Sequence, residues 1–297
     1  MSNLKDLKGA LVAIVTPFNE DGSIDYDSFA NLLKWQIESG TDGIIVCGTT
    51  GEAQGLTDEE YSELVKFTTA TIAGRIPVIA GATHASTRKV IELGKLAKSA
   101  GADCLLIATP YYVKPSQQGI YEHYKAVANA VDLPIIIYNI QSRTGKNIET
   151  ETILKLANEF ESIIGVKESS GDISQIKDVI SGRPAGFKVF SGDDYMTPAV
   201  IAASGGGAIS VFANEVPREA SQMTHLYLDG KNKEADEIFN KYKSLIALNF
   251  VGSSPDAVKT ALAAMGKIKE VFRLPICAME PAKKELLLAE LKKLELI

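Results

Sequence analysis

One lysine closes an apolar run that is typical of a buried strand. Residues 163–167 read IIGVK, with Lys167 in the last position. A lysine usually reaches water, because burying its ammonium group without a partner is costly. Desolvation at a strand end instead favours the neutral amine, which can attack a carbonyl carbon. A second interpretation is that Lys167 extends from the strand end to a carboxylate at the surface. From this stretch alone, that interpretation is the commoner one.

Other reactive residue types also follow apolar runs. The turn GTTGE offers the hydroxyls of Thr49 and Thr50 and backbone N–H groups before a helix. Such a turn can hold a carboxylate, although a plain helix cap is the alternative. Tyr138 ends another run, and Arg143 follows it in the turn SRTG. These residue types suit Schiff-base chemistry on a 2-keto acid, with an amine as nucleophile, a phenol as proton carrier and an arginine for a second carboxylate.

Two further segments carry polar residues after apolar runs. In TPYY, we expect Tyr111 to be a core anchor beside Tyr112. In SGDD, we expect Asp193 and Asp194 to cap a helix. Neither segment predicts chemistry by itself.

The positions of these residues depend on a repeated strand and helix pattern. Eight strand-like runs are predicted, at 10–15, 43–46, 77–80, 104–108, 134–138, 163–167, 188–191 and 207–211. Helical patterns lie between them, at 26–37, 57–71, 86–97, 117–130, 151–157, 173–180 and 195–203. The second of these opens with TDEE, a capping box. Eight strand–helix units predict a closed (β/α)8 barrel over residues 1–225.

Helical segments without strands follow the predicted barrel, at 231–247, 257–265 and 281–296. They predict a C-terminal helical extension over residues 226–297. A doubly wound open sheet is the competing architecture, but no GxGxxG follows the first strand.

Composition narrows the class of protein. The chain has 297 residues, 45% hydrophobic and 23% charged, with a formal net charge of -6, which is ordinary for a globular protein and gives no support for nucleic-acid binding. The three cysteines show no disulfide or CxxC pattern, and the three histidines have no metal-ligand spacing. No apolar signal core and no membrane-length stretch occur, so we expect a cytoplasmic enzyme with no metal and no membrane contact.

GTTGE, TPYY, YNIQSRTG, GVKES and SGDD occur in an order and spacing that resembles one family. The chain is similar over nearly its whole length to the dihydrodipicolinate synthase/N-acetylneuraminate lyase superfamily of class I aldolases. Tyr138 and Lys167 match residues that the whole superfamily shares. Arg143 resembles the synthase branch, since sialic acid lyases tend to carry a non-basic residue there.

The resemblance implies roles for individual residues. Lys167 would bind pyruvate as an imine, so that no cofactor is needed, and Arg143 would hold the carboxylate of L-aspartate 4-semialdehyde. Tyr138, Thr50 and Tyr112 would relay protons. Thr49 would lie beside the relay, and Gly192 and Ile209 would line the pyruvate pocket. The implied product is 4-hydroxy-tetrahydrodipicolinate, in lysine and diaminopimelate biosynthesis.

The resemblance also implies an assembly. In the family, the tyrosine that matches Tyr112 reaches in from a neighbouring subunit. This implies a homo-oligomer, usually a homotetramer built as a dimer of dimers.

Two departures from the family pattern affect these expectations. Gln141 stands where the family usually has proline, so the turn that carries Arg143 loses that rigid residue. The lysine feedback site of regulated members uses His, Asn and Glu side chains, and the matching positions here are Asp58, Tyr61, Ala85 and Lys89. A lysine at position 89 would repel the ammonium group of the effector, which predicts weak or absent inhibition by lysine.

Two other functions remain open from the sequence. A 2-keto-3-deoxy sugar acid or N-acetylneuraminate-type aldolase would use the same imine, but it needs hydroxyl-binding groups rather than Arg143. A non-catalytic barrel that binds a keto acid would not need the complete set of Lys167, Tyr138, Thr49 and Thr50.

Overall fold

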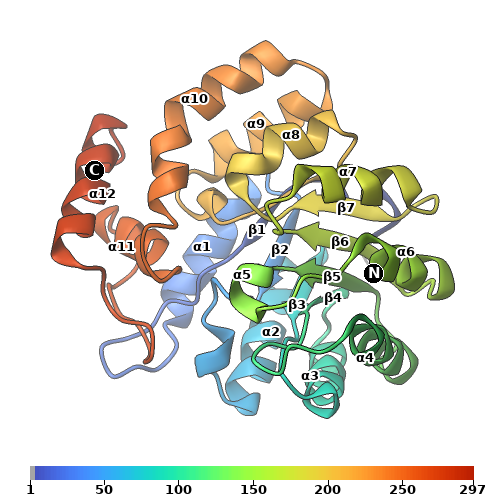
Figure 1. The fold of residues 1–297 in the computed structure, drawn as a ribbon. Coiled ribbons are helices and arrows are strands. Elements are labelled where there is room, and N and C mark those ends of the chain that lie inside the picture. The colour runs from blue at the N-terminus through green and yellow to red at the C-terminus, as the bar shows by residue number, and fades with distance from the viewer. Residues whose placement is uncertain (1–3) are drawn as a thin grey trace.

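The computed structural model describes residues 4–297 and contains a closed barrel of parallel strands (Figure 1). Each strand pairs with the next in the chain, and the eighth pairs with the first. The strands are β1 (Gly9–Ala13), β2 (Gly43–Val46), β3 (Val78–Gly81), β4 (Cys104–Ala108), β5 (Ile135–Asn139), β6 (Ile163–Glu168), β7 (Lys188–Ser191) and β8 (Gly207–Ser210). The predicted barrel is therefore confirmed, with each strand boundary within two residues of its expected position.

The strands are apolar along their whole length because both of their faces are buried. In β1, Leu11 and Ala13 belong to a cluster inside the barrel, whereas Val12 packs outward in the larger core beneath the helices. Ile45 points inward from β2 in the same way, between Ile44 and Val46, which belong to the outer core. Two separate buried layers explain why these strands show no polar alternation.

Helices surround the barrel, and a short helix follows β5. The helices that accompany the strands are α1 (Tyr26–Glu38), α2 (Asp58–Ile72), α3 (Thr87–Ser99), α4 (Gln117–Ala130), α5 (Gln141–Thr144), α6 (Thr150–Glu159), α7 (Ile173–Gly182), α8 (Thr197–Ala202) and α9 (Pro217–Leu228). The sequence pattern missed α5, which was expected as a turn, and it missed α9. The expected boundary between the barrel and the C-terminal extension, after residue 225, falls inside α9. This helix ends at Leu228, three residues beyond that boundary.

The start of α2 confirms the predicted capping box. Thr57 is the N-cap, and its hydroxyl accepts a hydrogen bond from the Glu60 N–H. The Glu60 carboxylate accepts in return from the Thr57 N–H. These two bonds satisfy N–H groups that the first helical turn leaves unpaired, which is why α2 begins directly after the loop that follows β2.

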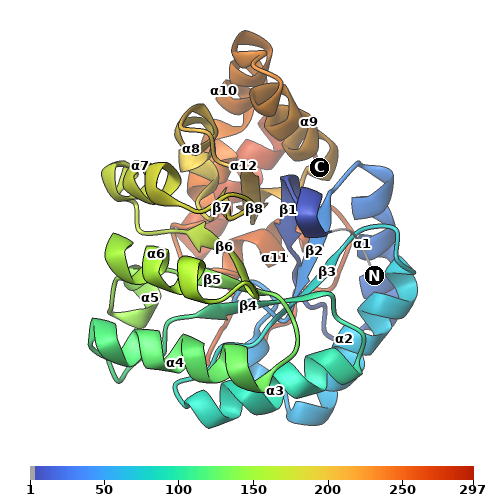
Figure 2. The same cartoon turned by 90° about the vertical axis from the view of Figure 1, so that its right-hand side faces the viewer.

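Three helices follow the barrel: α10 (Asn232–Leu248), α11 (Asp256–Ala264) and α12 (Pro281–Lys293). In Figure 1, α11 and α12 lie at the left of the barrel and α10 lies above it; the view turned by 90° places α11 and α12 behind the strands and keeps α10 above them (Figure 2). The segment between α11 and α12 returns to the loop after β2, since the Arg273 N–H donates to the Glu52 carboxylate. No helix within residues 4–297 is long and apolar enough to cross a membrane.

Candidate active site

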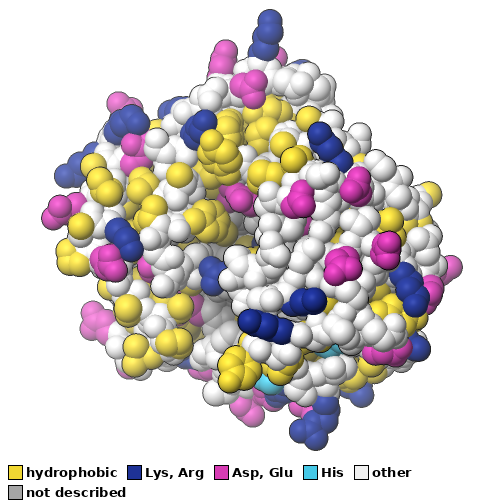
Figure 3. Space-filling view, viewed as in Figure 1, with side chains coloured by type: hydrophobic (Ala, Val, Ile, Leu, Met, Phe, Trp, Pro, Cys, Tyr) yellow, Lys and Arg dark blue, Asp and Glu magenta, His cyan; other side chains and the backbone are white. Residues whose placement is uncertain are grey.

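A cavity of about 220 Å³ opens at the carboxyl ends of the strands. Figure 3 shows a hollow near the centre of this face of the molecule, with basic side chains beside it. The walls combine apolar residues from inside the barrel with polar residues from the loops, among them Thr49, Thr50, Tyr138, Arg143 and Lys167. This is the face on which (β/α)8 enzymes carry their active sites.

Lys167 reaches this cavity from the end of β6. The residue is only 4% exposed, and its Nζ lies 4.4 Å from the centre of the Tyr138 ring. Among the described residues, Lys167 Nζ has no carboxylate partner and no side-chain hydrogen bond. The commoner alternative for such a lysine, a pairing with a surface carboxylate, is therefore wrong. An amine that faces a cavity without a fixed partner is placed for attack on a carbonyl group.

The register of the sheet brings Tyr138 to Lys167. In the pairing of β5 with β6, Tyr138 lies directly beside Lys167. Tyr138 is 8% exposed and belongs to the cluster inside the barrel. Neighbouring parallel strands place paired residues on the same side of the sheet, so both side chains enter the barrel mouth.

The residue after Lys167 anchors the end of β6 on the outer side of the barrel. Glu168 accepts hydrogen bonds from Asn139 Nδ2 at 3.1 Å and from Ser170 Oγ at 2.7 Å. Its carboxylate also accepts from Gln175 Nε2 at 3.4 Å, and burial raises the pKa of Glu168. These bonds join the ends of β5 and β6 and hold the strand end that carries Lys167.

The GTTGE turn presents the two threonines. Thr50 is buried and Thr49 is exposed, and neither hydroxyl has a hydrogen-bond partner among the described residues. The turn is closed by the Glu52 N–H, which donates to the Thr49 carbonyl at 3.1 Å. It is also tied to the loop after β1, since Thr16 Oγ1 donates to the Gly51 carbonyl at 2.7 Å. Two hydroxyls on a fixed turn are free to bind a ligand.

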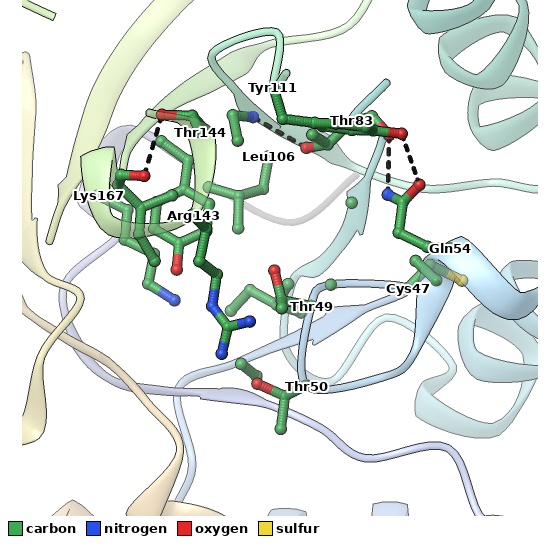
Figure 4. A pocket seen from close by; sticks show the side chains of 18 residues that line it. Cys47, Thr49, Thr50, Gln54, Thr83, Leu106, Tyr111, Arg143, Thr144 and Lys167 are labelled. Atoms are coloured by element: carbon green, nitrogen blue, oxygen red, sulfur yellow. Dashed lines mark hydrogen bonds between the residues drawn. The ribbon is translucent and has the colours of Figure 1, made fainter. Parts of the chain in front are cut away.

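Arg143 is carried by α5, the helical turn after β5. Gly145, in the left-handed region with φ of 72°, ends this turn. The guanidinium of Arg143 donates to the Ser254 carbonyl at 3.3 Å. Figure 4 shows Arg143, Lys167 and Thr49 around the same open space. Gln141, which replaces the family's proline, lies in the first position of α5, where its Nε2 is 3.5 Å from the Ser170 carbonyl.

Gly192 lies against Lys167 without lining the cavity. A methyl group on its Cα would come within 2.7 Å of Lys167 Cε and 2.1 Å of Ser169 Oγ. Only glycine therefore leaves room for the lysine at this point. Ile209 is fully buried inside the barrel below the cavity.

Tyr112 lies outside the cavity of its own chain. The side chain is 89% exposed, and its backbone has a φ of 69°, which is uncommon for a bulky residue. Its neighbour Tyr111 lines the cavity instead of anchoring the core, so that expectation is wrong. Tyr111 Oη donates to Gln54 Oε1 at 2.9 Å.

Several residues of the cavity wall were missed by the sequence analysis. Gln54 Nε2 donates to the Thr83 carbonyl at 3.2 Å, and Thr83 Oγ1 accepts from the Ala108 N–H at 2.9 Å (Figure 4). Thr83 follows β3, so the rule that placed polar residues after strands could have found it. Cys47 also lines the cavity, but burial raises the pKa of its thiol, which disfavours a thiolate nucleophile.

Asp193 and Asp194 have different roles. Asp193 caps the short helix Asp194–Met196, as expected, by accepting from the Tyr195 N–H at 2.9 Å. Asp194 does not cap a helix. It is buried and accepts from the N–H groups of Val211 and Phe212 at 2.9 and 3.0 Å, which fixes the loop after β8.

The site is built from an amine, hydroxyls, a phenol and a guanidinium. No group of three or more His, Cys, Asp or Glu side chains within residues 4–297 is arranged to hold a metal ion. The donor set can bind an acid through its carboxylate and attack an adjacent carbonyl carbon.

Comparisons with known proteins agree with this chemistry. The model of the dihydrodipicolinate synthetase family matches residues 6–294. The chain is 46% identical over 297 residues to the 4-hydroxy-tetrahydrodipicolinate synthase of Chlorobium phaeovibrioides (strain DSM 265 / 1930), and the match covers 100% of both chains.

Solved structures give the same likeness. The chloride-inhibited dihydrodipicolinate synthase from Acinetobacter baumannii, complexed with pyruvate, is 40% identical with a TM-score of 0.95, and 98% of this chain and 99% of that one are covered. A structure described as the first monomeric dihydrodipicolinate synthase variant is 38% identical with a TM-score of 0.96, and 99% of each chain is covered.

Proposed function

The chain belongs to the dihydrodipicolinate synthetase family, and we propose that Lys167, Tyr138, Thr49, Thr50 and Arg143 carry out its reaction. That reaction is the condensation of pyruvate with L-aspartate 4-semialdehyde to 4-hydroxy-tetrahydrodipicolinate, a step of lysine and diaminopimelate biosynthesis. The observation that carries the proposal is the amine of Lys167, which is buried at the cavity and has no ion-pair partner among the described residues.

Imine formation is the first step that we assign. The amine of Lys167 attacks the keto carbon of pyruvate, and loss of water gives the imine. Protons must move to the leaving oxygen and later away from the pyruvate methyl group. Tyr138, whose ring lies 4.4 Å from Lys167 Nζ, is the proposed proton carrier, with Thr50 as its partner in the relay.

Binding of the pyruvate carboxylate is assigned to the GTTGE turn. Thr49 and Thr50 offer hydroxyls that have no other partner among the described residues. A carboxylate held by the turn would direct the keto carbon of pyruvate toward Lys167. Holding the two reacting groups in this orientation accelerates the attack.

The second substrate is assigned to Arg143. Loss of a methyl proton converts the imine to an enamine, whose terminal carbon attacks the aldehyde carbon. The amine of the same substrate then closes the ring onto the former keto carbon and displaces Lys167. Arg143 lies at the cavity wall, and among the described residues its guanidinium has one hydrogen bond, to the Ser254 carbonyl. The guanidinium can bind a carboxylate with two bonds.

The lysine imine itself accepts the electrons that form the enamine, so the proposed chemistry calls for no metal and no organic cofactor. We also propose a cytoplasmic enzyme and a homotetramer in which Tyr112 of one subunit joins the relay of its neighbour. The support for the latter is the exposed, strained position of Tyr112 beside a residue of the cavity wall.

A paired assay tests the proposed function. Intact mass after borohydride treatment with pyruvate should show one covalent adduct, and peptide mapping should locate it on Lys167. Turnover with pyruvate and L-aspartate 4-semialdehyde should accompany it, and Lys167→Ala should lose both signals. An adduct without turnover would favour a sugar-acid aldolase, and no adduct would overturn the imine mechanism.

A further inference from the structure

A buried ion pair joins the C-terminal extension to the GTTGE turn, and the proposed mechanism does not use it. Lys259 lies in α11, and its Nζ contacts Glu52 Oε1. The Lys259 side chain is 0% exposed and the Glu52 side chain 2%. Both charges are therefore removed from water, in a chain where other ion pairs such as Lys98–Asp132 lie at the surface.

A second residue of the extension completes the surroundings of Glu52. The Arg273 N–H donates to Glu52 Oε2 at 3.0 Å, so each carboxylate oxygen has a partner from the extension. The Arg273 guanidinium itself pairs with Glu60 at 2.6 Å. The ring of Phe18 has Lys259 Nζ at 4.3 Å and Arg273 Cζ at 4.5 Å from its centre. Glu52 itself does not line the cavity, so the extension holds the turn through a residue outside the site.

The backbone of Glu52 carries this constraint to the threonines. Glu52 adopts the left-handed region with φ of 52°, which a residue with a side chain takes up only when its surroundings hold it there. Its N–H donates to the Thr49 carbonyl at 3.1 Å. Side chain and backbone of one residue therefore connect the extension to the turn that presents Thr49 and Thr50.

Charge burial of this kind is a poor source of stability. Two ions lose their hydration when they are buried, and a well-packed apolar pair of similar volume often stabilises a fold as much or more. What a directed ion pair supplies is a fixed position for both partners. The extension also contacts a second residue of the cavity wall, since the Ser254 carbonyl just before α11 accepts from Arg143.

We propose that Lys259 is a positioning residue for pyruvate, which acts through Glu52 to fix the turn that carries Thr49 and Thr50. This inference rests on the proposed function, because it assigns the pyruvate carboxylate to that turn. It makes the C-terminal extension part of the substrate-binding machinery.

The test compares full-length variants by pyruvate trapping. Lys259→Met alone would leave the buried Glu52 charge without its counter-ion and is expected to lose folded protein. The double variant Glu52→Gln with Lys259→Met removes both charges, so it should fold. We expect it to need about tenfold more pyruvate for half-maximal borohydride trapping, with complete trapping at saturation. Glu52→Gln alone keeps an acceptor for the Arg273 N–H, but it leaves the buried Lys259 ammonium without its counter-ion, so it is also expected to lose folded protein.

The control is Lys269→Met, which removes another lysine of the extension. Lys269 is half exposed and contacts Asn19 and Asp25 rather than the turn. This variant should need the same pyruvate concentration as the wild type for half-maximal borohydride trapping. A folded Glu52→Gln, Lys259→Met double variant that does the same would overturn the role of Lys259. A wild-type protein that forms no adduct would instead overturn the proposed function itself.

Discussion

Among the residues whose burial the structure describes, two lysines are almost fully buried, and their surroundings separate their roles. Lys259 pairs with Glu52, whereas Lys167 faces a cavity with the ring of Tyr138 as its neighbour and no carboxylate partner among the described residues. An unpaired buried amine is costly for a fold, so its presence at a cavity indicates chemistry. The pairing of Lys259 with Glu52 instead indicates a role in holding Glu52 in place.

Arg143 gives the sharpest prediction at the scale of one side chain. Arg143→Ala should keep the pyruvate adduct on Lys167, because that step needs only the amine, the tyrosine and the turn. Condensation should fall by about 100-fold or more, since a charge-assisted, two-bond contact to the second carboxylate is lost. Steady-state kinetics beside intact mass would measure this. Unchanged condensation would mean that the second substrate is not held by Arg143.

At the scale of elements, the ends of neighbouring strands determine which side chains meet. Tyr138 and Lys167 are 29 positions apart in the sequence, yet the register of β5 and β6 makes them direct neighbours. The outer bonds of Glu168 to Asn139 hold the same two strand ends together. Contacts between paired strands thus set the geometry of the proposed imine formation.

The pair between α2 and α3 bears on regulation. Lys89 in α3 contacts Asp58 at the start of α2, and this hydrogen bond raises the pKa of Lys89. Both residues line a second cavity beside Tyr61, so a positive charge already occupies its wall. We expect millimolar L-lysine to leave the rate unchanged, relative to a salt control of equal ionic strength. Clear inhibition at sub-millimolar lysine would contradict this.

The contact of α9 with the loop before β2 predicts a dependence of stability on pH. His225 Nε2 lies 2.7 Å from Asp42 Oδ2, and this hydrogen bond raises the pKa of His225. The charge of Asp229 also raises the pKa of His225, while burial and the charge of Lys8 lower it. A raised pKa in the folded state stabilises the protein below the ordinary histidine pKa of about 6.5, and the contribution is lost as the pH rises through the raised value.

The measurement is the melting temperature of wild type and His225→Gln between pH 6 and 9. Because the pair is half exposed, its contribution is about 1 kcal/mol or less, or roughly 2 °C in melting temperature. The difference between the two proteins should be largest near pH 6 and should vanish near pH 9. A difference that stays constant with pH would show that the charge of His225 has no part in it.

At the scale of the whole molecule, one chain contains most of the proposed site but not all of it. Lys167, Tyr138, Thr49, Thr50 and Arg143 meet at one cavity, while Tyr112 points away from it. If Tyr112 serves the site of a neighbouring subunit, the assembly completes the relay. Two inactive variants can then restore each other.

Mixing variants tests this arrangement. Lys167→Ala and Tyr112→Phe should each be nearly inactive as pure oligomers. After joint refolding in equal amounts, a mixed dimer would contain one site with both Lys167 and Tyr112. Random assembly then predicts recovery of about a quarter of the wild-type activity in a closed two-subunit exchange. Sedimentation of the same samples would report the oligomer, and no recovery in a mixed oligomer would contradict the exchange of Tyr112.

The sequence by itself determined the barrel and the reactive residues at its mouth. Apolar runs of strand length recur at a nearly regular spacing, and parallel strands that are buried on both faces must read in this way. The carboxyl ends of the strands meet at one face of a barrel, so the sequence alone assigns Lys167, Tyr138, Arg143 and the GTTGE turn to one site.

Only the tertiary structure decided the contacts between distant segments. The sequence pattern missed α9 and the role of Asp194, because each depends on what packs against it rather than on local periodicity. The Glu52–Lys259 pair joins residues 207 positions apart, and the exposure of Tyr112 follows from the path of one loop. Local sequence encodes periodicity and caps, whereas the partner of a buried charge is chosen by the folded chain.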